Sequence, residues 1–330
     1  MKRAFKWIGS LLVVALIALF AIDYTPDTDP AAMRAKYASP ASQFVSIGGG
    51  LTMHVRDEGK RDGPVLVLLH GSNSSLQVWE PWVARLGSKY RIISLDQIGH
   101  GLTGPNPTRQ YDAAAFVGTL DALLNKLGVT RFALAGSSMG GWVAWEYALA
   151  YPDKLTHLAL LDSAGPPDDP ARSLSLGLMI QQTPVLNRIS KYITPRSMVE
   201  RSYRGILADP RLATAAKVER VWELIRYPGN RQATLDIIAA RKAQLQHADR
   251  LGSIRVPTLI LWGAKDPNIA VSGADWFAQR IPGSVKIVYP AVGHVPMEEV
   301  PDRSAADLDA FLSAPFPSPA KPPSIAPVKP

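Results

Sequence analysis

The chain has 330 residues, of which 47% are hydrophobic and 19% charged, so it can bury a sizeable core in one large or two small domains. It contains no cysteine, which excludes disulfides, cysteine-based zinc sites, iron–sulfur clusters and thiolate catalysis. Lys and Arg outnumber Asp and Glu by 36 to 28, a formal net charge of +8.

Most of the positive charge lies between residues 163 and 255, which contain 15 Lys and Arg against 8 Asp and Glu. A basic segment can attract anionic lipid surfaces or acidic substrates, but the simpler interpretation is a solvated, arginine-rich helical surface. The sequence has no helix-turn-helix, zinc-finger or aromatic-rich single-strand pattern, so we expect no nucleic acid as a partner.

The N-terminal residues combine basic side chains with an uncharged apolar run. Lys2, Arg3 and Lys6 precede the run Ile8–Ile22, which is short for a membrane span of about 17–25 residues and long for a signal-peptide core of about 7–15. Because no pair of small residues gives a good cleavage site, we predict an uncleaved transmembrane signal anchor over residues 1–22.

With a basic flank in the cytoplasm, the rest of the chain would lie outside it, on the periplasmic side in a Gram-negative cell. A cleaved signal with a secreted product is the alternative, followed by a buried N-terminal core helix. Residues 23–42 are predicted to form a linker with a short helix. The last 17 residues, 314–330, include seven prolines and are predicted to be disordered.

Strand-like runs alternate with helical ones over residues 43–313. Gln43–Ile47 and Thr52–Glu58 flank three glycines, which is a hairpin signal. Continuous apolar runs, typical of strands buried on both faces, occur at 65–69, 91–95, 132–135, 158–161, 258–262 and 285–289. Helical periodicity occurs at 76–86, 113–127, 140–150 and 305–312. The alternation predicts an α/β fold with a mostly parallel, doubly wound sheet and helices on both faces.

The interval between Leu161 and Thr258 breaks this alternation. It contains helical stretches and no convincing strand. The stretches lie at roughly 171–182, 196–207, 211–226 and 231–246. We therefore predict a helical cap subdomain over about 165–252, above the carboxyl ends of the strands.

A G-x-S-x-G motif lies between the strand at 132–135 and the helix that follows it. A nucleophile on so sharp a strand-to-helix turn needs small residues two positions before and after it. Gly136 and Gly140 meet this need for Ser138. If Ser137 were the nucleophile, Met139 would occupy one of these positions, and a methionine does not fit. Ser138 is the predicted nucleophile.

A serine nucleophile needs a base, which is itself oriented by a third group. The motif order predicts an acid and then a histidine downstream, each just after a strand. Asp266 follows the strand at 258–262, and His294 follows the strand at 285–289. Asp162, at the end of an earlier strand, is a rival acid. A turn-capping aspartate and a surface histidine are the non-catalytic interpretations of Asp266 and His294.

The upstream half should supply an oxyanion hole. The sequence His70-Gly71-Ser72 directly follows the strand at 65–69, and a turn there can aim the Ser72 backbone N–H at the same point as the Met139 N–H. Two such donors at a developing oxyanion are worth about 3 kcal/mol each. His70 is expected to brace the loop, and Asp96 to order the turn that contains His100.

These motifs resemble those of the α/β-hydrolase-fold serine hydrolases, of the esterase or lipase type with a helical cap. The resemblance rests on HGS at 70–72, DQIGHG at 96–101, GSSMGG at 136–141, LWGAKD at 261–266 and GHVPMEEVP at 293–301. It implies a triad of Ser138, Asp266 and His294, and oxyanion donors at Ser72 and Met139.

The function expected from this resemblance is hydrolysis of a small carboxylic ester through an acyl-enzyme, without cofactor or metal. The acyl group is expected to be apolar, because Leu174, Leu176, Leu178, Met179 and Ile180 form an apolar stretch in the predicted cap. A carbon–carbon bond hydrolase and an acyltransferase use the same pattern. A non-catalytic ligand-binding or sensor protein on this scaffold is the alternative from another class.

Overall fold

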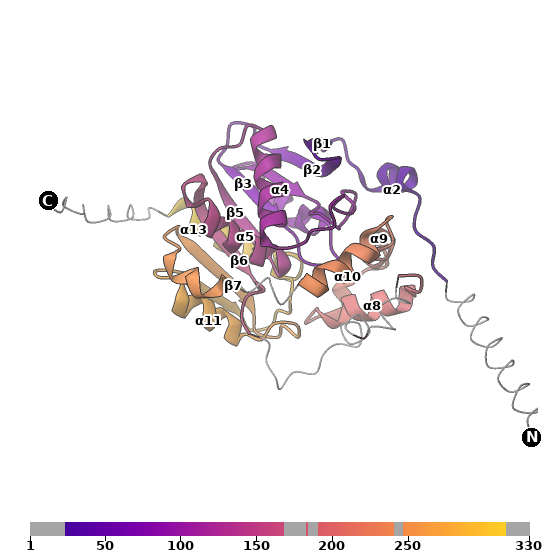
Figure 1. Ribbon diagram of the computed structural model, residues 1–330. Helices are drawn as coiled ribbons and strands as arrows, with labels where there is room; N and C mark the ends of the chain where they lie inside the picture. The colour runs from indigo at the N-terminus through magenta and orange to yellow at the C-terminus, as the bar shows by residue number, and fades with distance from the viewer. Residues whose placement is uncertain (1–23, 168–182, 184–190, 241–246, 315–330) are drawn as a thin grey trace, which may run out of the picture.

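The computed structural model describes residues 24–167, 183, 191–240 and 247–314 (Figure 1). Eight strands form one sheet in the order β1-β2-β4-β3-β5-β6-β7-β8. The bounds are β1 Ser42–Gly48, β2 Leu51–Gly59, β3 Val65–Leu69, β4 Arg91–Leu95, β5 Phe132–Ser137, β6 Leu155–Leu161, β7 Thr258–Gly263 and β8 Val285–Tyr289. β2 pairs antiparallel with β1 and β4, and the other neighbours are parallel. The predicted mostly parallel α/β sheet is confirmed.

Helices cover both faces of this sheet, and the central strand β3 is apolar at every position. In β3, Val67 and Leu69 belong to a core that includes side chains of α4, α5 and α11, whereas Leu66 and Leu68 face a second core that includes α3 and α13. Alternate side chains of a strand point to opposite faces, so a continuous apolar run fills both. The helices are α3 Glu80–Leu86, α4 Ala113–Lys126, α5 Met139–Ala150, α11 Ser272–Arg280, α12 Pro296–Glu299 and α13 Pro301–Ser313.

Three helices between β6 and β7 lie over the carboxyl edge of the sheet. They are α8 Arg196–Gly205, α9 Ala215–Ile225 and α10 Asn230–Ala240. The Asn230 side chain donates to Gly101 O at 3.1 Å, and the Thr234 hydroxyl donates to Asn73 Oδ1 at 3.0 Å. These bonds join α10 to the loops after β4 and β3. The predicted stretch at 171–182 lies outside the described residues.

Acidic side chains from other parts of the chain neutralise several of the basic groups on these helices. Lys217 and Arg220 of α9 both approach the buried Glu298 of α12, at 3.1 and 4.0 Å. Arg231 of α10 pairs with Asp27 at 2.6 Å. These three basic residues therefore form ion pairs that join the helices over the sheet edge to other parts of the fold.

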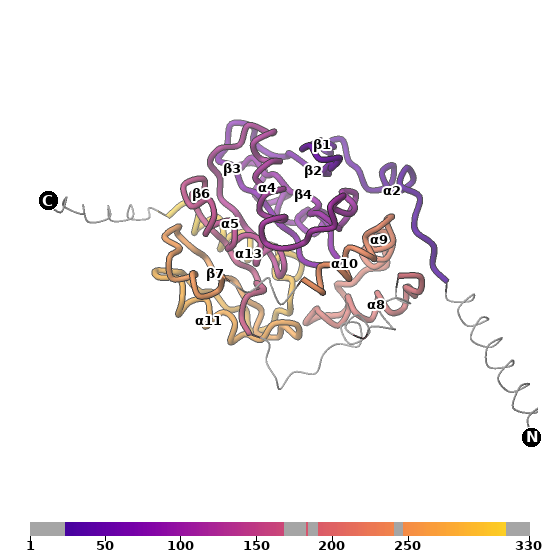
Figure 2. The backbone as a smooth tube through the Cα atoms, viewed as in Figure 1, coloured from indigo at the N-terminus to yellow at the C-terminus, as the bar shows by residue number. Residues whose placement is uncertain are grey.

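Residues 24–37 run along these helices (Figure 2). The Thr25 N–H donates to Tyr192 O at 2.8 Å, and the Thr28 N–H donates to Arg226 O at 2.9 Å. α2, Pro30–Tyr37, follows, and the Asp29 side chain caps its first turn. The expected short helix in this stretch is thus present, and the preceding backbone is hydrogen-bonded to the segment around α8 to α10.

The expected transmembrane signal anchor is corrected by the structure. No helix among the described residues is both long and apolar enough to cross a membrane. The longest of them, α4, has 14 residues and spans about 21 Å, against a hydrocarbon thickness of about 30 Å. The apolar run Ile8–Ile22, on which the expectation rested, lies outside the described residues.

Candidate active site

Ser138 has a strained backbone at the turn between β5 and α5. Its φ of 54° and ψ of −118° lie in a region that costs a non-glycine residue about 1–3 kcal/mol. Four hydrogen bonds hold it there. Its N–H donates to Leu161 O at 2.9 Å, and its carbonyl accepts from the N–H groups of Gly141, Trp142 and Ala164. The strain is therefore enforced by the surrounding strands and helix.

The glycines on either side of Ser138 are required by close backbone approaches. A Cβ at Gly136 would lie 2.1 Å from the carbonyl oxygen of Gly140, and a Cβ at Gly140 would lie 2.3 Å from that of Leu69. Neither neighbour is a flexible side chain, so no substitution fits without moving the backbone. The turn can keep this shape only with glycine at both positions.

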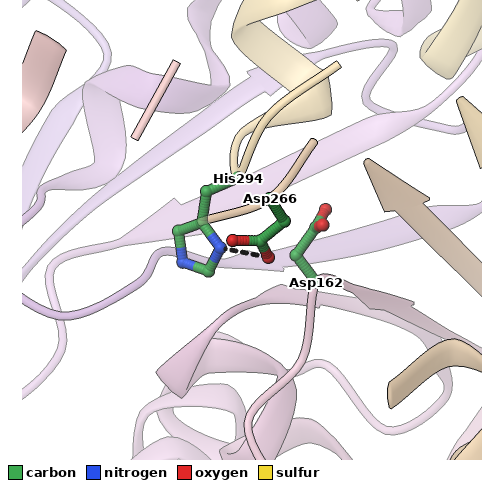
Figure 3. Close-up of side chains that lie close together, drawn as sticks. All are labelled: Asp162, Asp266 and His294. Carbon is green, nitrogen blue, oxygen red and sulfur yellow. Dashed lines mark hydrogen bonds and ion pairs between the residues drawn. The ribbon is translucent and has the colours of Figure 1, made fainter. Parts of the chain in front are cut away.

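His294 and Asp266 are bonded side chain to side chain (Figure 3). His294 Nδ1 lies 2.7 Å from Asp266 Oδ2, and both residues are buried. Asp266 Oδ1 accepts from the N–H groups of Asn268 and Ile269, at 2.7 and 3.0 Å. Burial raises the pKa of Asp266, but His294 and these N–H groups outweigh it, and the pKa lies below its ordinary value. A charged Asp266 places the His294 proton on Nδ1 and leaves Nε2 as an acceptor.

Ser138, Asp266 and His294 follow β5, β7 and β8 at one edge of the sheet. β6 and β7 separate β5 from β8, so these two strand ends are about 14 Å apart. The loop after β8 turns back across the end of β7. The close approach of the two backbones shows this, since a Cβ at Gly263 would lie 1.9 Å from Gly293 O. Among the described residues, Asp266 and His294 are joined, whereas no hydrogen bond joins Ser138 Oγ to His294.

The loop after β3 passes directly against Ser138. A Cβ at Gly71 would lie 3.0 Å from Ser138 Cβ and 3.6 Å from its Oγ. In the described part of the chain, neither the Ser72 N–H nor the Met139 N–H donates a hydrogen bond. Met139 is the first residue of α5, where backbone N–H groups have no partner within the helix and the helix dipole favours negative charge. Both predicted donors are therefore available.

His70 joins this loop to the loop after β4. Its Nε2 accepts from the Gln97 N–H at 3.1 Å, its Nδ1 bonds Gly71 O at 2.7 Å, and the Gln97 side chain donates to His70 O. Burial lowers the pKa of His70. Burial, followed by the neighbouring His70, lowers the pKa of His100 to about 3. Both imidazoles are neutral near pH 7, and His70 braces the loop as its position in the sequence suggested.

Asp162 lies beside the Asp266–His294 pair. It is fully buried, with φ of 44°. Its Oδ1 accepts from the Gly263 N–H at 2.9 Å, whereas its Oδ2 has no hydrogen-bond partner among the described residues. Burial, followed by the charge of Asp266, raises the pKa of Asp162 well above its ordinary value. The His294 ring therefore donates to Asp266, and the rival acid Asp162 lies next to this pair.

In the described part of the chain, Asp162, Asp266 and His294 are also the one group of acidic and histidine side chains close enough to share a metal ion, with ligand atoms within 4.8 Å of one another. The bond between His294 Nδ1 and Asp266 Oδ2 already uses two of these atoms. A hydrogen-bonded histidine of this kind fits acid–base chemistry better than a metal centre.

Glu299 was given no role in the sequence, and it holds the His294 loop in place. Its Oε1 accepts from the N–H groups of Gly293 and Val295, and its Oε2 accepts from the Ala208 N–H at 2.8 Å. The His294 N–H donates to a carbonyl in the same segment after α8. The sequence signal for this contact was the pair Glu298-Glu299, which follows His294 by four and five residues.

A second Ser–His–Asp chain was also missed. Ser42 Oγ lies 2.8 Å from His54 Nε2, and His54 Nδ1 lies 2.7 Å from Asp96 Oδ2. Asp96 also accepts from the N–H groups of Leu76 and Leu102, both at 2.8 Å. These bonds join β1 and β2 to the loops after β3 and β4, so Asp96 orders its turn as expected.

Comparison with known proteins agrees with this architecture. The chain is 27% identical over 271 residues to Lipase 1 of Psychrobacter immobilis, covering 82% of this chain and 83% of the lipase. It is 28% identical over 263 residues to the monoacylglycerol lipase ABHD6 of Mus musculus, covering 76% of each.

Among solved structures, Cfl2 from Burkholderia cenocepacia is similar with a TM-score of 0.73 and 25% identity, covering 82% of this chain and 95% of that one. The family model of the alpha/beta hydrolase fold matches residues 64–301. That span includes Ser138, Asp266 and His294 and exceeds half of the chain. The protein therefore belongs to the alpha/beta hydrolase fold family.

Proposed function

We propose that this protein is a serine hydrolase that cleaves carboxylic esters, with Ser138 as nucleophile, His294 as general base and Asp266 as its acid partner. The proposal rests on one observation: Ser138 has a strained backbone at the start of α5, at the same sheet edge where His294 is hydrogen-bonded to Asp266. Membership of a hydrolase family and the similarity to two lipases support an ester as the substrate.

The geometry suggests the following reaction. Ser138 Oγ attacks the ester carbonyl while its proton passes to His294 Nε2, and Asp266 stabilises the resulting imidazolium. The tetrahedral oxyanion accepts from the N–H groups of Ser72 and Met139. His294 then protonates the leaving alkoxide, and the ester C–O bond breaks to give an acyl-enzyme. Water, deprotonated by His294, then attacks the acyl carbonyl; the bond to Ser138 Oγ breaks, His294 returns the proton to Ser138, and the acid leaves. We expect the bond between Ser138 and His294 to form when substrate fills the site.

The acyl-enzyme leaves two further outcomes open to measurement. An acceptor other than water would make the protein an acyltransferase, and attack on a ketone would make it a carbon–carbon bond hydrolase. The apolar stretch expected to receive the acyl group, residues 174–180, lies outside the described residues. An ester with an apolar acyl group remains the expected substrate.

Turnover of p-nitrophenyl esters of graded chain length tests the proposal, with the full chain, Ser138→Ala and Ser137→Ala. Ser137 lies in the same motif and its side chain is buried, which makes it a matched control. We expect Ser138→Ala to lower kcat by about 10⁴-fold or more and Ser137→Ala to keep it within about tenfold. Equal turnover of Ser138→Ala and wild type would contradict the proposal. New esters or amides on adding alcohols or amines would identify an acyltransferase.

A further inference from the structure

Two carboxyl groups lie side by side under the predicted catalytic histidine. Asp162 is fully buried and Asp266 is 4% exposed. Ligand atoms of both lie within 4.8 Å of each other and of a His294 ring nitrogen, and Figure 3 shows the two side chains next to one another. Two adjacent buried carboxylates repel, so such a pair carries one proton between them.

The hydrogen bonds show which of the two is the charged member. Asp266 accepts from His294 and from the backbone N–H groups of Asn268 and Ile269, which is the environment of a carboxylate. Asp162 accepts one hydrogen bond, from Gly263, and its Oδ2 has no donor near it among the described residues. A buried carboxylate oxygen without a donor is costly, whereas a protonated oxygen can donate to a neighbouring carboxylate.

Among the described residues, no Lys or Arg is found among the groups that act on the charge of Asp162. The titratable groups that face it are Asp266 after β7, Glu299 of α12 and Tyr289 of β8, and His294 is hydrogen-bonded to Asp266. The two acidic neighbours favour a neutral Asp162, and a tyrosine supplies no cation.

We propose that Asp162 is protonated in the folded protein and donates from Oδ2 to the Asp266 carboxylate. It would thus act as a positioning residue that holds Asp266 against His294. The effect on turnover rests on the proposed function. The protonation itself does not, because it follows from the packing of β6 against β7.

Asparagine is the natural substitution with which to test this. Its amide can donate to Asp266 and accept from Gly263, as the protonated acid does, but it carries no titratable proton. The φ of 44° at this position is tolerated by asparagine better than by most residues. Asp162→Asn should therefore fold and isolate the proton from the hydrogen bond.

The first arm measures the unfolding equilibrium constant against pH by chemical denaturation. In the unfolded chain an aspartate ionises near pH 3.9, so above about pH 5 only the folded state holds the Asp162 proton. The unfolding constant of wild type should then rise tenfold per pH unit relative to Asp162→Asn between pH 5 and 7. The exposed Asp302, which pairs with Arg85, gives the control, since Asp302→Asn should leave the slope unchanged.

The second arm measures kcat and KM for an ester. Asp162→Asn should keep kcat within about threefold, whereas Asp162→Ala should lower kcat about tenfold or more with little change in KM, because it removes the donor to Asp266. A pH-independent ratio of unfolding constants would overturn the proposal whatever the activity. A loss of kcat in Asp162→Asn as large as the loss in Asp266→Asn would also overturn it. So would a loss of wild-type activity of that size when a chelator is added, because that would indicate a cation shared by the two carboxylates. Failure of Ser138→Ala to affect turnover would instead count against the proposed function alone.

Discussion

Two Ser–His–Asp arrangements occur in the described part of this chain, and they differ in instructive ways. Ser42, His54 and Asp96 are joined by hydrogen bonds from end to end. In the other arrangement His294 and Asp266 are joined, whereas Ser138 Oγ has no hydrogen bond to His294 in the described residues. Judged by hydrogen bonds alone, the first would be the better catalytic triad.

The surroundings of the two serines reverse that judgement. Ser42 lies in the extended strand β1, and its Oγ also accepts from the Ser39 N–H at 3.0 Å. Ser138 has the strained backbone of the elbow and lies beside two backbone N–H groups that have no partner in the described residues. Strain held in place by the fold and donors aimed at a developing charge are features of reacting groups. The fully bonded chain of Ser42 is a structural brace.

The largest difference between the two arrangements is expected at their histidines. His294→Gln should lower kcat by about 10⁴-fold or more, because it removes the proposed general base. His54→Gln should keep kcat within about tenfold in the folded fraction and cost about 3–5 kcal/mol of unfolding free energy, because it leaves Asp96 buried without its partner. Ester turnover and denaturant titrations measure the two effects. Loss of turnover in folded His54→Gln, with full turnover in His294→Gln, would reverse the assignment.

A smaller difference is expected in acid. Burial raises the pKa of Asp96, but His54 and, to a lesser degree, His70 and the Leu102 N–H outweigh it, so the pKa lies below its ordinary value. Asp96 therefore contributes stability above its unfolded pKa of about 3.9, and this stability is lost as pH falls through the folded pKa.

In that acid window Asp96 contributes at most about 1.4 kcal/mol per pH unit to the slope of unfolding free energy. Asp96→Asn should make the unfolding free energy rise less steeply with pH in this window. Asp162→Asn should have the opposite effect at higher pH, because it removes a group that makes the unfolding free energy fall as pH rises. Denaturant titrations between pH 3 and 7 measure both. Identical acid slopes in wild type and Asp96→Asn would show that Asp96 does not gain its stabilisation in the folded state.

The sheet could be predicted from the sequence because its central strands are apolar on both faces and glycines or acids mark their ends. The helix α11 was missed because its apolar face is small: of the nine residues Ser272–Arg280, only Gly273, Ala274 and Phe277 are buried. Such a helix is stabilised by packing against the core, and a local sequence pattern does not reveal that packing.

The positions of the candidate site residues and the pairing of Asp266 with His294 followed from the strand ends and the motif order, but the other contacts did not. Asp162 and Asp266 meet because β6 and β7 are neighbours in the sheet order, and Ser42 meets His54 through the register of the hairpin that β1 forms with β2. Contacts across strands far apart in sequence depend on topology and register. The predicted signal anchor was wrong in that no described helix is long and apolar enough to cross a membrane; the apolar run on which it rested lies outside the described residues.

The most direct measurement is the site of attachment of a fluorophosphonate probe on the full-length wild-type chain, found by mass spectrometry of its peptides. Such probes phosphonylate a serine that a base activates beside oxyanion donors. The probe should be found on the peptide that contains Ser138 and not on the one that contains Ser42. An adduct on Ser42, or a folded protein without any adduct, would contradict the assignment of Ser138 as the nucleophile.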